Sequence, residues 1–198
     1  GVPVDSRPKS RLPITKTAAD SVEQRLSQIG LAGKPFALIH PAAAFDTKQW
    51  PTENFARIAE YFSLNGTEVV AVAAANETGV LEKLAASAKF RVHSFSDLSL
   101  PEITAIAEKA RIFVGNDSGI AHIAAAVGTP VITIYGPTDW RDWAPEGRKH
   151  RVIMPAKDCV PCREKGCRGE GRSECLEELT AGAVKEAIEE FLSEAHAG

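Results

Sequence analysis

The stretch IFVGNDSGIAHIAAAVG, residues 112–128, contains the pattern that decides the fold. An apolar run at Ile112–Val114 leads through a small polar turn into the apolar stretch Ser118–Val127, which a glycine closes. Apolar runs without polar alternation are typical of parallel strands buried on both faces, and glycine is common just after a helix. The stretch therefore predicts a strand, a tight turn and a helix packed against a sheet.

The same alternation continues on both sides of this stretch. Further strands are predicted at Phe36–Ile39, Val69–Ala73, Phe90–Val92, Val131–Tyr135 and, as the weakest run, Arg151–Met154. Apolar residues at helical spacing predict helices over residues 20–29, 51–64, 78–86, 101–110 and 180–192. Strands alternating with helices are typical of an α/β fold, here a Rossmann-like doubly wound parallel sheet whose commonest strand order is 3-2-1-4-5-6.

Composition places the chain among ordinary globular proteins. Its 198 residues are 44% apolar and 25% charged, with a net charge of −3. This excludes a disordered, collagen-like or small disulfide-stapled chain, and no apolar run reaches the ~18 residues of a membrane span. A weakly acidic chain without a basic tract also predicts no nucleic-acid partner. We expect a lead-in at residues 1–17, rich in Pro, Lys, Arg and Ser, and one domain over residues 18–198.

Two loops of this fold are expected to carry the function. In the predicted strand order, the loops after the first and fourth strands lie side by side where the order reverses. These loops begin at His40 and Asn116. Because ligands of doubly wound folds bind at this point, the site is predicted there.

The turn before the helix predicts an anion site. Backbone N–H groups and the positive end of the helix dipole are open at Ser118 and Gly119, which suits a phosphate or diphosphate. A plain helix cap, formed by Asp117 or Ser118, is the alternative. Lys48 is the one cation of the first loop and is placed to meet the anion, whereas a lone lysine is more often simply solvated. His122 lies one turn into the helix, where a core histidine is the alternative to a ligand contact.

Together the two loops resemble glycosyltransferase family 9, the ADP-heptose lipopolysaccharide heptosyltransferases of Gram-negative bacteria. The matching stretches run from His40-Pro41-Ala42 through Lys48-Gln49-Trp50-Pro51, then Asn116-Asp117-Ser118-Gly119 with His122, Gly136-Pro137-Thr138 and Trp143-Ala144-Pro145. The resemblance implies the C-terminal, nucleotide-sugar-binding half of a two-domain GT-B enzyme. Such an enzyme transfers heptose, with inversion, from ADP-heptose to the inner core of lipopolysaccharide.

The resemblance also implies roles for individual residues. Backbone groups at Ser118 and Gly119 would hold the diphosphate, and Lys48 would neutralise it. The remaining contacts would be Asp117 and His122 at the sugar–phosphate site, Glu77 on the ribose hydroxyls and Thr138 beside the sugar. Transfer would require no cofactor.

Two departures from the family stand out. The family usually has glycine in the first loop, where this chain has Ala42 and Ala43. The N-terminal domain is expected to be missing, and the resemblance places both the lipopolysaccharide core acceptor and the catalytic carboxylate in that domain. We therefore expect no catalytic residue within these 198 residues, which should bind the donor without transferring its sugar. The implied location is the cytoplasm, including its border with the inner membrane.

All four cysteines fall within 17 positions: Cys159, Cys162, Cys167 and Cys175. The spacing of the first pair suits metal chelation, and four thiolates favour a structural Zn or Fe ion. Two disulfides, or four free thiols, are the alternatives. The cluster also leaves a non-enzymatic metal-binding or redox module open as a function, and another enzyme of the same fold, such as a sugar-nucleotide epimerase, is a further alternative.

Overall fold

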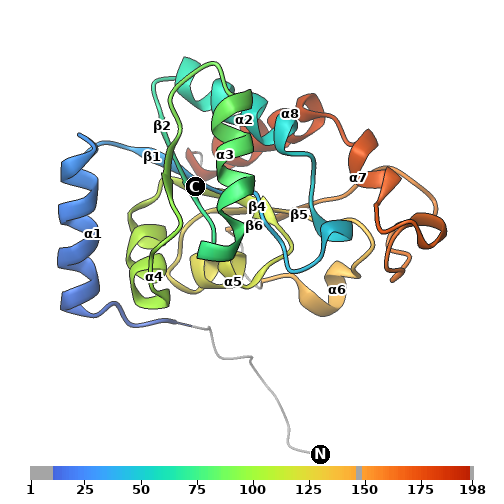
Figure 1. Ribbon diagram of the computed structural model, residues 1–198, viewed down its shortest axis with the longest axis horizontal. Helices are drawn as coiled ribbons and strands as arrows, with labels where there is room; N and C mark the ends of the chain where they lie inside the picture. Colours follow the sequence, from blue (N-terminus) through green and yellow to red (C-terminus); the bar gives the residue numbers. More distant parts are fainter. Residues whose placement is uncertain (1–10, 146–148, 197–198) are drawn as a thin grey trace, which may run out of the picture.

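A computed structural model describes residues 11–145 and 149–196 of the chain. It contains a six-stranded parallel sheet with the order β3-β2-β1-β4-β5-β6, which confirms the predicted fold class and strand order (Figure 1). The strands are β1 (Phe36–His40), β2 (Glu68–Val72), β3 (His93–Phe95), β4 (Ile112–Asn116), β5 (Val131–Ile134) and β6 (His150–Ile153).

Helices cover both faces of the sheet. One face carries α2 (Thr52–Leu64), α3 (Thr78–Ser87) and α8 (Ala181–His196), and the other carries α1 (Lys16–Gln28), α4 (Leu100–Lys109) and α5 (Gly119–Ala126). Alternate strand residues feed the two cores: Ala37 and Ile39 pack under the first set, Phe36 and Leu38 under the second. This two-sided burial is the reason why the central strands have no polar alternation.

In the described part of the chain, five short helices lie in the segments that connect the longer elements. They are η1 (Asp46–Lys48), η2 (Ala75–Glu77), α6 (Trp140–Trp143), η3 (Cys167–Gly169) and α7 (Glu174–Glu178). None of these was predicted, since three to five residues carry too little periodicity. Figure 1 shows α6, α7 and the orange loop between them gathered on one side of the molecule, opposite α1.

Two predicted elements need correction. The strand expected at Phe90–Val92 lies three residues later, at β3, and Phe90 is 43% exposed. The first helix begins at Lys16 rather than at residue 20, because the Thr15 hydroxyl caps it by accepting from the Ala18 N–H at 3.3 Å. Of the expected lead-in, residues 1–10 lie outside the described part of the chain.

Asn116 ties the two predicted loops together. It ends β4 and is completely buried, and its side-chain oxygen accepts from the Trp50 backbone N–H at 3.0 Å. Its side-chain amide donates to the Pro41 carbonyl at 2.8 Å. Trp50 in turn donates from its indole to the Leu179 carbonyl at 2.8 Å. The sequence between β1 and α2 is thereby fixed to β4 and to the segment before α8.

A second cross-link joins α1 to α4. The Glu102 carboxylate accepts from the Ser21 hydroxyl at 2.6 Å and from the Ser99 backbone N–H at 2.8 Å, which caps α4. The Ser21 bond, followed by the bonds from Ser99, lowers the pKa of Glu102 from 4.5 to about 2. The ionised carboxylate is therefore the form that the folded protein prefers.

Replacing Glu102 by Gln should lower the free energy of unfolding at pH 7 by about 1 kcal/mol. Because the folded pKa is depressed, the stabilisation is complete above pH 4.5 and disappears as the pH falls towards 2. Urea unfolding of both proteins between pH 7 and pH 2 measures the difference. Glu108→Gln, an exposed change on the same helix, is the control. A difference that stays constant with pH would contradict the ionic origin.

Asn116→Ala should lower the free energy of unfolding by about 2 kcal/mol or more. The change leaves the Trp50 N–H and the Pro41 carbonyl buried without partners, and each unsatisfied group costs about 1–3 kcal/mol. Denaturant unfolding measures the loss, with the exposed Asn76→Ala as the control. Equal stability of the two variants would show that the cross-link does not hold the loops.

Candidate functional site

The predicted loops do lie side by side. β1 pairs with β4, and His40 at the end of β1 lies opposite Gly115 near the end of β4. The Gly115 position has no room for a side chain, since a Cβ there would lie 2.7 Å from the Phe113 ring and 3.0 Å from the His40 carbonyl oxygen. Close packing at this point brings the residues that follow each strand to one edge of the sheet.

The start of α5 has open polar groups. Ser118 is the residue before the helix, but its side chain makes no capping bond, and its Oγ is buried without a hydrogen-bond partner among the described residues. Gly119 is exposed, and the space where its Cβ would stand is open. The alternative of a plain cap at Ser118 is therefore not supported. A buried hydroxyl beside free helix N–H groups suits an anion such as a phosphate.

Lys48 faces this helix start, as predicted. Its ammonium lies 2.8 Å from the Asp117 carboxylate, with the two side chains 28% and 10% exposed. The alternative of a merely solvated lysine does not hold, because Lys48 is paired and half-buried. Asp117 pairs with Lys48 rather than capping α5, so both charges stand next to the open Ser118 hydroxyl.

Tyr135 lies near Asp117 and was not predicted as a site residue. It is 1% exposed and donates from its hydroxyl to the Trp143 carbonyl at 3.0 Å. Burial, followed by the nearby Asp117 carboxylate, raises the pKa of Tyr135 above its ordinary value. The hydroxyl therefore stays protonated. Only the apolar run of β5 pointed to this position, as part of the core.

A cavity of about 290 Å³ opens beside the start of α5. Ser118 and Gly119 line it at one end, and Glu77 lines it from η2. One Glu77 oxygen accepts from the Ala74 N–H at 2.9 Å, while the second has no hydrogen-bond partner among the described residues. Ala43, one of the two alanines that replace the family's glycine, lines this cavity too, whereas Ala42 is fully buried.

His40 also lines this cavity. Its Nδ1 lies 2.8 Å from the Val72 carbonyl oxygen, so this nitrogen carries the proton and donates. Burial lowers the pKa of His40 below its ordinary value, which keeps the ring neutral near pH 7. The cavity thus combines an acceptor nitrogen, a carboxylate and apolar walls.

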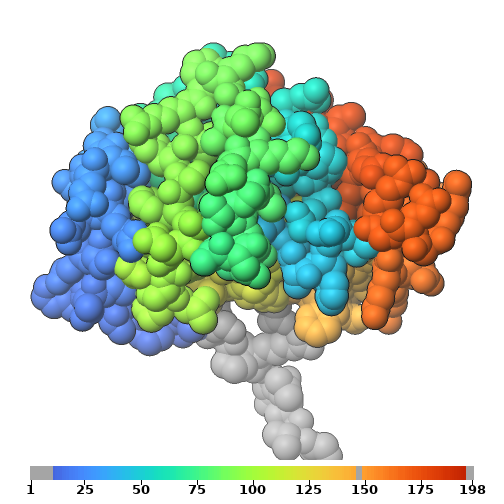
Figure 2. Space-filling model, in the orientation of Figure 1, coloured from blue at the N-terminus to red at the C-terminus, as the bar shows by residue number. Residues whose placement is uncertain are grey.

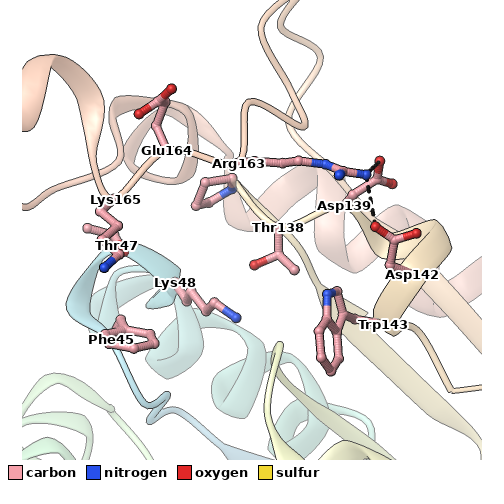
Figure 3. Close-up of a pocket in the computed structure, with 11 residues that line it drawn as sticks. Phe45, Thr47, Lys48, Thr138, Asp139, Asp142, Trp143, Arg163, Glu164 and Lys165 are labelled. Atoms are coloured by element: carbon pink, nitrogen blue, oxygen red, sulfur yellow. Dashed lines mark hydrogen bonds and ion pairs between the residues drawn. The ribbon is translucent and has the colours of Figure 1, made fainter.

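A second cavity, of about 400 Å³, lies on the other side of Lys48. Figure 3 shows Lys48 and Thr138 directed into it, between Phe45 and Trp143. Residues 163–165 form a further wall. Thr138 and Lys48 therefore line the same cavity.

His122 lines neither of these two cavities. It is exposed on α5 and lines a third hollow, of about 540 Å³, together with Leu12 and Pro145. The alternative of a buried core histidine is wrong, because the His122 side chain is exposed.

The metal centre predicted at the four cysteines is not preformed among the described residues. All four are free thiols, which also leaves the disulfide alternative without support. Across the described ranges, no three His, Cys, Asp or Glu side chains are arranged to hold a metal ion. Cys175 is 3% exposed in the core, and burial raises the pKa of its thiol to about 11.

Among the described residues, no helix combines the length and the apolar character that crossing a membrane requires.

Comparison with known proteins places these features in a family. Residues 5–172 match the description "Glycosyltransferase family 9 (heptosyltransferase)". Lipooligosaccharide heptosyltransferase 2 of Haemophilus influenzae is 28% identical over 182 residues, which is 88% of this chain and 53% of that protein. This chain thus spans about half the length of the curated relatives that it matches over most of its own length.

Solved structures share the fold. A glycosyltransferase of family 9 from Veillonella parvula superposes with a TM-score of 0.83 at 20% identity, over 98% of this chain and 57% of that one. The E. coli heptosyltransferase WaaC with ADP-2-deoxy-2-fluoro heptose superposes with a TM-score of 0.61 at 29% identity, over 79% of this chain and 43% of that one. With most of its residues matched to one family, the chain belongs to glycosyltransferase family 9.

Proposed function

We propose that the chain is the donor-binding half of an inverting heptosyltransferase of lipopolysaccharide inner-core synthesis, with ADP-heptose as its donor. The observation that carries this proposal is the buried, unpartnered Ser118 hydroxyl at the open start of α5. Ser118 lines the smaller cavity, and its neighbour Asp117 pairs with Lys48, which lines the larger one, so a diphosphate at Ser118 could carry one group towards each cavity.

In this proposal the diphosphate binds at Ser118 and Gly119. Helix N–H groups and the Ser118 hydroxyl donate to it, and the Lys48 ammonium neutralises part of its charge. The smaller cavity takes the adenosine, with the free oxygen of Glu77 accepting from the ribose hydroxyls. A solved relative that is 29% identical holds ADP-2-deoxy-2-fluoro heptose, which supports ADP-heptose as the donor.

The larger cavity then faces the sugar, with Thr138 beside it and Asp117 at the junction with the diphosphate. His122, one turn along α5, contacts the sugar–phosphate only if it turns away from the hollow that it now lines. Transfer needs no cofactor in this scheme. The acceptor and the general base belong to an N-terminal domain, as in the two-domain enzymes that the family resemblance implies.

Calorimetric titration with ADP tests the site. Ser118→Ala should leave the free energy of unfolding unchanged or raise it, because it removes a buried hydroxyl that has no partner among the described residues. The same variant should lower the affinity for ADP about threefold to tenfold. Lys48→Ala should weaken ADP about tenfold or more, since a charge-assisted phosphate contact contributes about 1.5–3 kcal/mol.

Lys89→Ala is the matched control, because the Lys89 side chain is 80% exposed and lines neither cavity. Unchanged ADP affinity in both the Ser118 and the Lys48 variants would remove the diphosphate from this position. UDP binding more tightly than ADP would overturn the adenosine assignment and favour the epimerase alternative.

The 198-residue chain should bind ADP-heptose without transferring heptose to a lipid A–Kdo acceptor. A transfer assay with purified protein, run beside the donor titration, measures both properties on the same sample. Turnover would place the general base within this chain and contradict the proposal that it belongs to an N-terminal domain.

A further inference from the structure

The cavity on the far side of Lys48 carries two exposed aromatic side chains. Phe45 is 59% exposed and Trp143 is 63% exposed, and both line the same 400 Å³ space. They come from different loops, Phe45 from the sequence before η1 and Trp143 from the end of α6. Large apolar groups left open on two sides of one cavity are typical of a binding site rather than of packing.

The Trp143 ring is exposed on a fixed backbone. Its carbonyl accepts from the buried Tyr135 hydroxyl at 3.0 Å, and α6 is capped by Asp139, whose carboxylate accepts from the Arg141 N–H at 3.1 Å. In Figure 3 the indole faces the space into which Lys48 and Thr138 also point. Aromatic and polar groups are therefore presented together.

Besides Phe45 and Trp143, residues 163–165 of the Cys-rich segment (residues 157–177) line the same cavity. Arg163 donates from its backbone N–H to the Pro137 carbonyl at 2.7 Å. Its guanidinium lies 2.9 Å from Asp139 and 2.8 Å from Asp142, which fastens the segment to α6. At the other end, Ser173 donates to the Thr47 carbonyl at 2.6 Å. Figure 2 shows the orange segment beside the cyan stretch after β1.

The charges of the lining nearly cancel. Three basic residues stand against three acidic ones, with Arg163 already paired to Asp139 and Asp142. The cavity beyond Lys48 is thus not built for a second anion. A neutral ring with many hydroxyls fits better, because its C–H faces pack on aromatic rings and its hydroxyls bond to groups such as Thr138 and Lys48.

We propose that Phe45 and Trp143 are the aromatic walls of a subsite for the donor's sugar ring, and that the Cys-rich segment closes this subsite through Arg163. The inference rests on the proposed function, because the sugar reaches this cavity only if the diphosphate lies at Ser118. It gives the Cys-rich segment a role in ligand recognition that needs no metal.

Titration of the full chain with ADP and with ADP-heptose separates the sugar contacts from the nucleotide contacts. Trp143→Ala should lower the affinity for ADP-heptose about fivefold to tenfold and change the affinity for ADP by less than about twofold. Trp143→Phe should keep most of the affinity, since it keeps an aromatic face. Phe90→Ala removes an exposed aromatic side chain outside the cavity and should change neither ligand.

The wall formed by the Cys-rich segment is tested in the same way. Arg163→Ala should weaken ADP-heptose severalfold and leave ADP unchanged. Arg172→Ala, which removes an arginine paired with Glu170 and Glu177 in the same segment, is the control and should change neither ligand.

The outcomes distinguish the two proposals. If wild-type protein binds neither ligand, the proposed function fails and this inference fails with it. If ADP binds but the Trp143 and Arg163 variants bind ADP-heptose as wild type does, the proposed function stands and the sugar subsite is overturned. Equal losses for ADP and ADP-heptose would also overturn it, because they indicate a nucleotide contact or a general loosening of the site.

Discussion

The site depends on one buried amide, that of Asn116. Parallel strands β1 and β4 can pair without fixing the loops that follow them, because those loops leave the sheet. Asn116 fixes them by bonding to Pro41 and Trp50 at the same time. Through the Trp50 indole the constraint extends to the Leu179 carbonyl, and so to the segment that joins the Cys-rich region to α8. The walls of both cavities are therefore positioned from a single point at the end of β4.

Much of the fold follows from the sequence because the central strands are buried on both faces. Each such strand must be an uninterrupted apolar run, and the runs alternate with helical patterns, which fixes both the class and the strand order. The prediction failed at β3, which lies at the edge of the sheet and includes the half-buried Phe95 and the exposed Ser94. There the apolar run at Phe90–Val92 was a misleading signal, since an edge strand needs no continuous burial.

The candidate site was predictable to the extent that it follows from strand ends. Lys48, Ser118 and Gly119 stand at the two loops that the topology brings together. Trp143 and Arg163 could not be predicted as site residues from the sequence, because their positions depend on hydrogen bonds and ion pairs between separate segments of the chain. The metal site suggested by the cysteine spacing stays a prediction, while the fold buries Cys175 in the core.

The pairing of Lys48 with Asp117 sets how strongly an anion can be held. The two side chains are 28% and 10% exposed, so the pair is partly buried. Charge-assisted bonds to a phosphate contribute about 1.5–3 kcal/mol each. In the proposed function, a diphosphate at the start of α5 would compete with Asp117 for the Lys48 ammonium. The Tyr135 hydroxyl near Asp117 stays protonated and donates to the Trp143 carbonyl. The Lys48–Asp117 pair is thus charge-balanced, and the proposed anion site needs both the Lys48 ammonium and the donors at the start of α5.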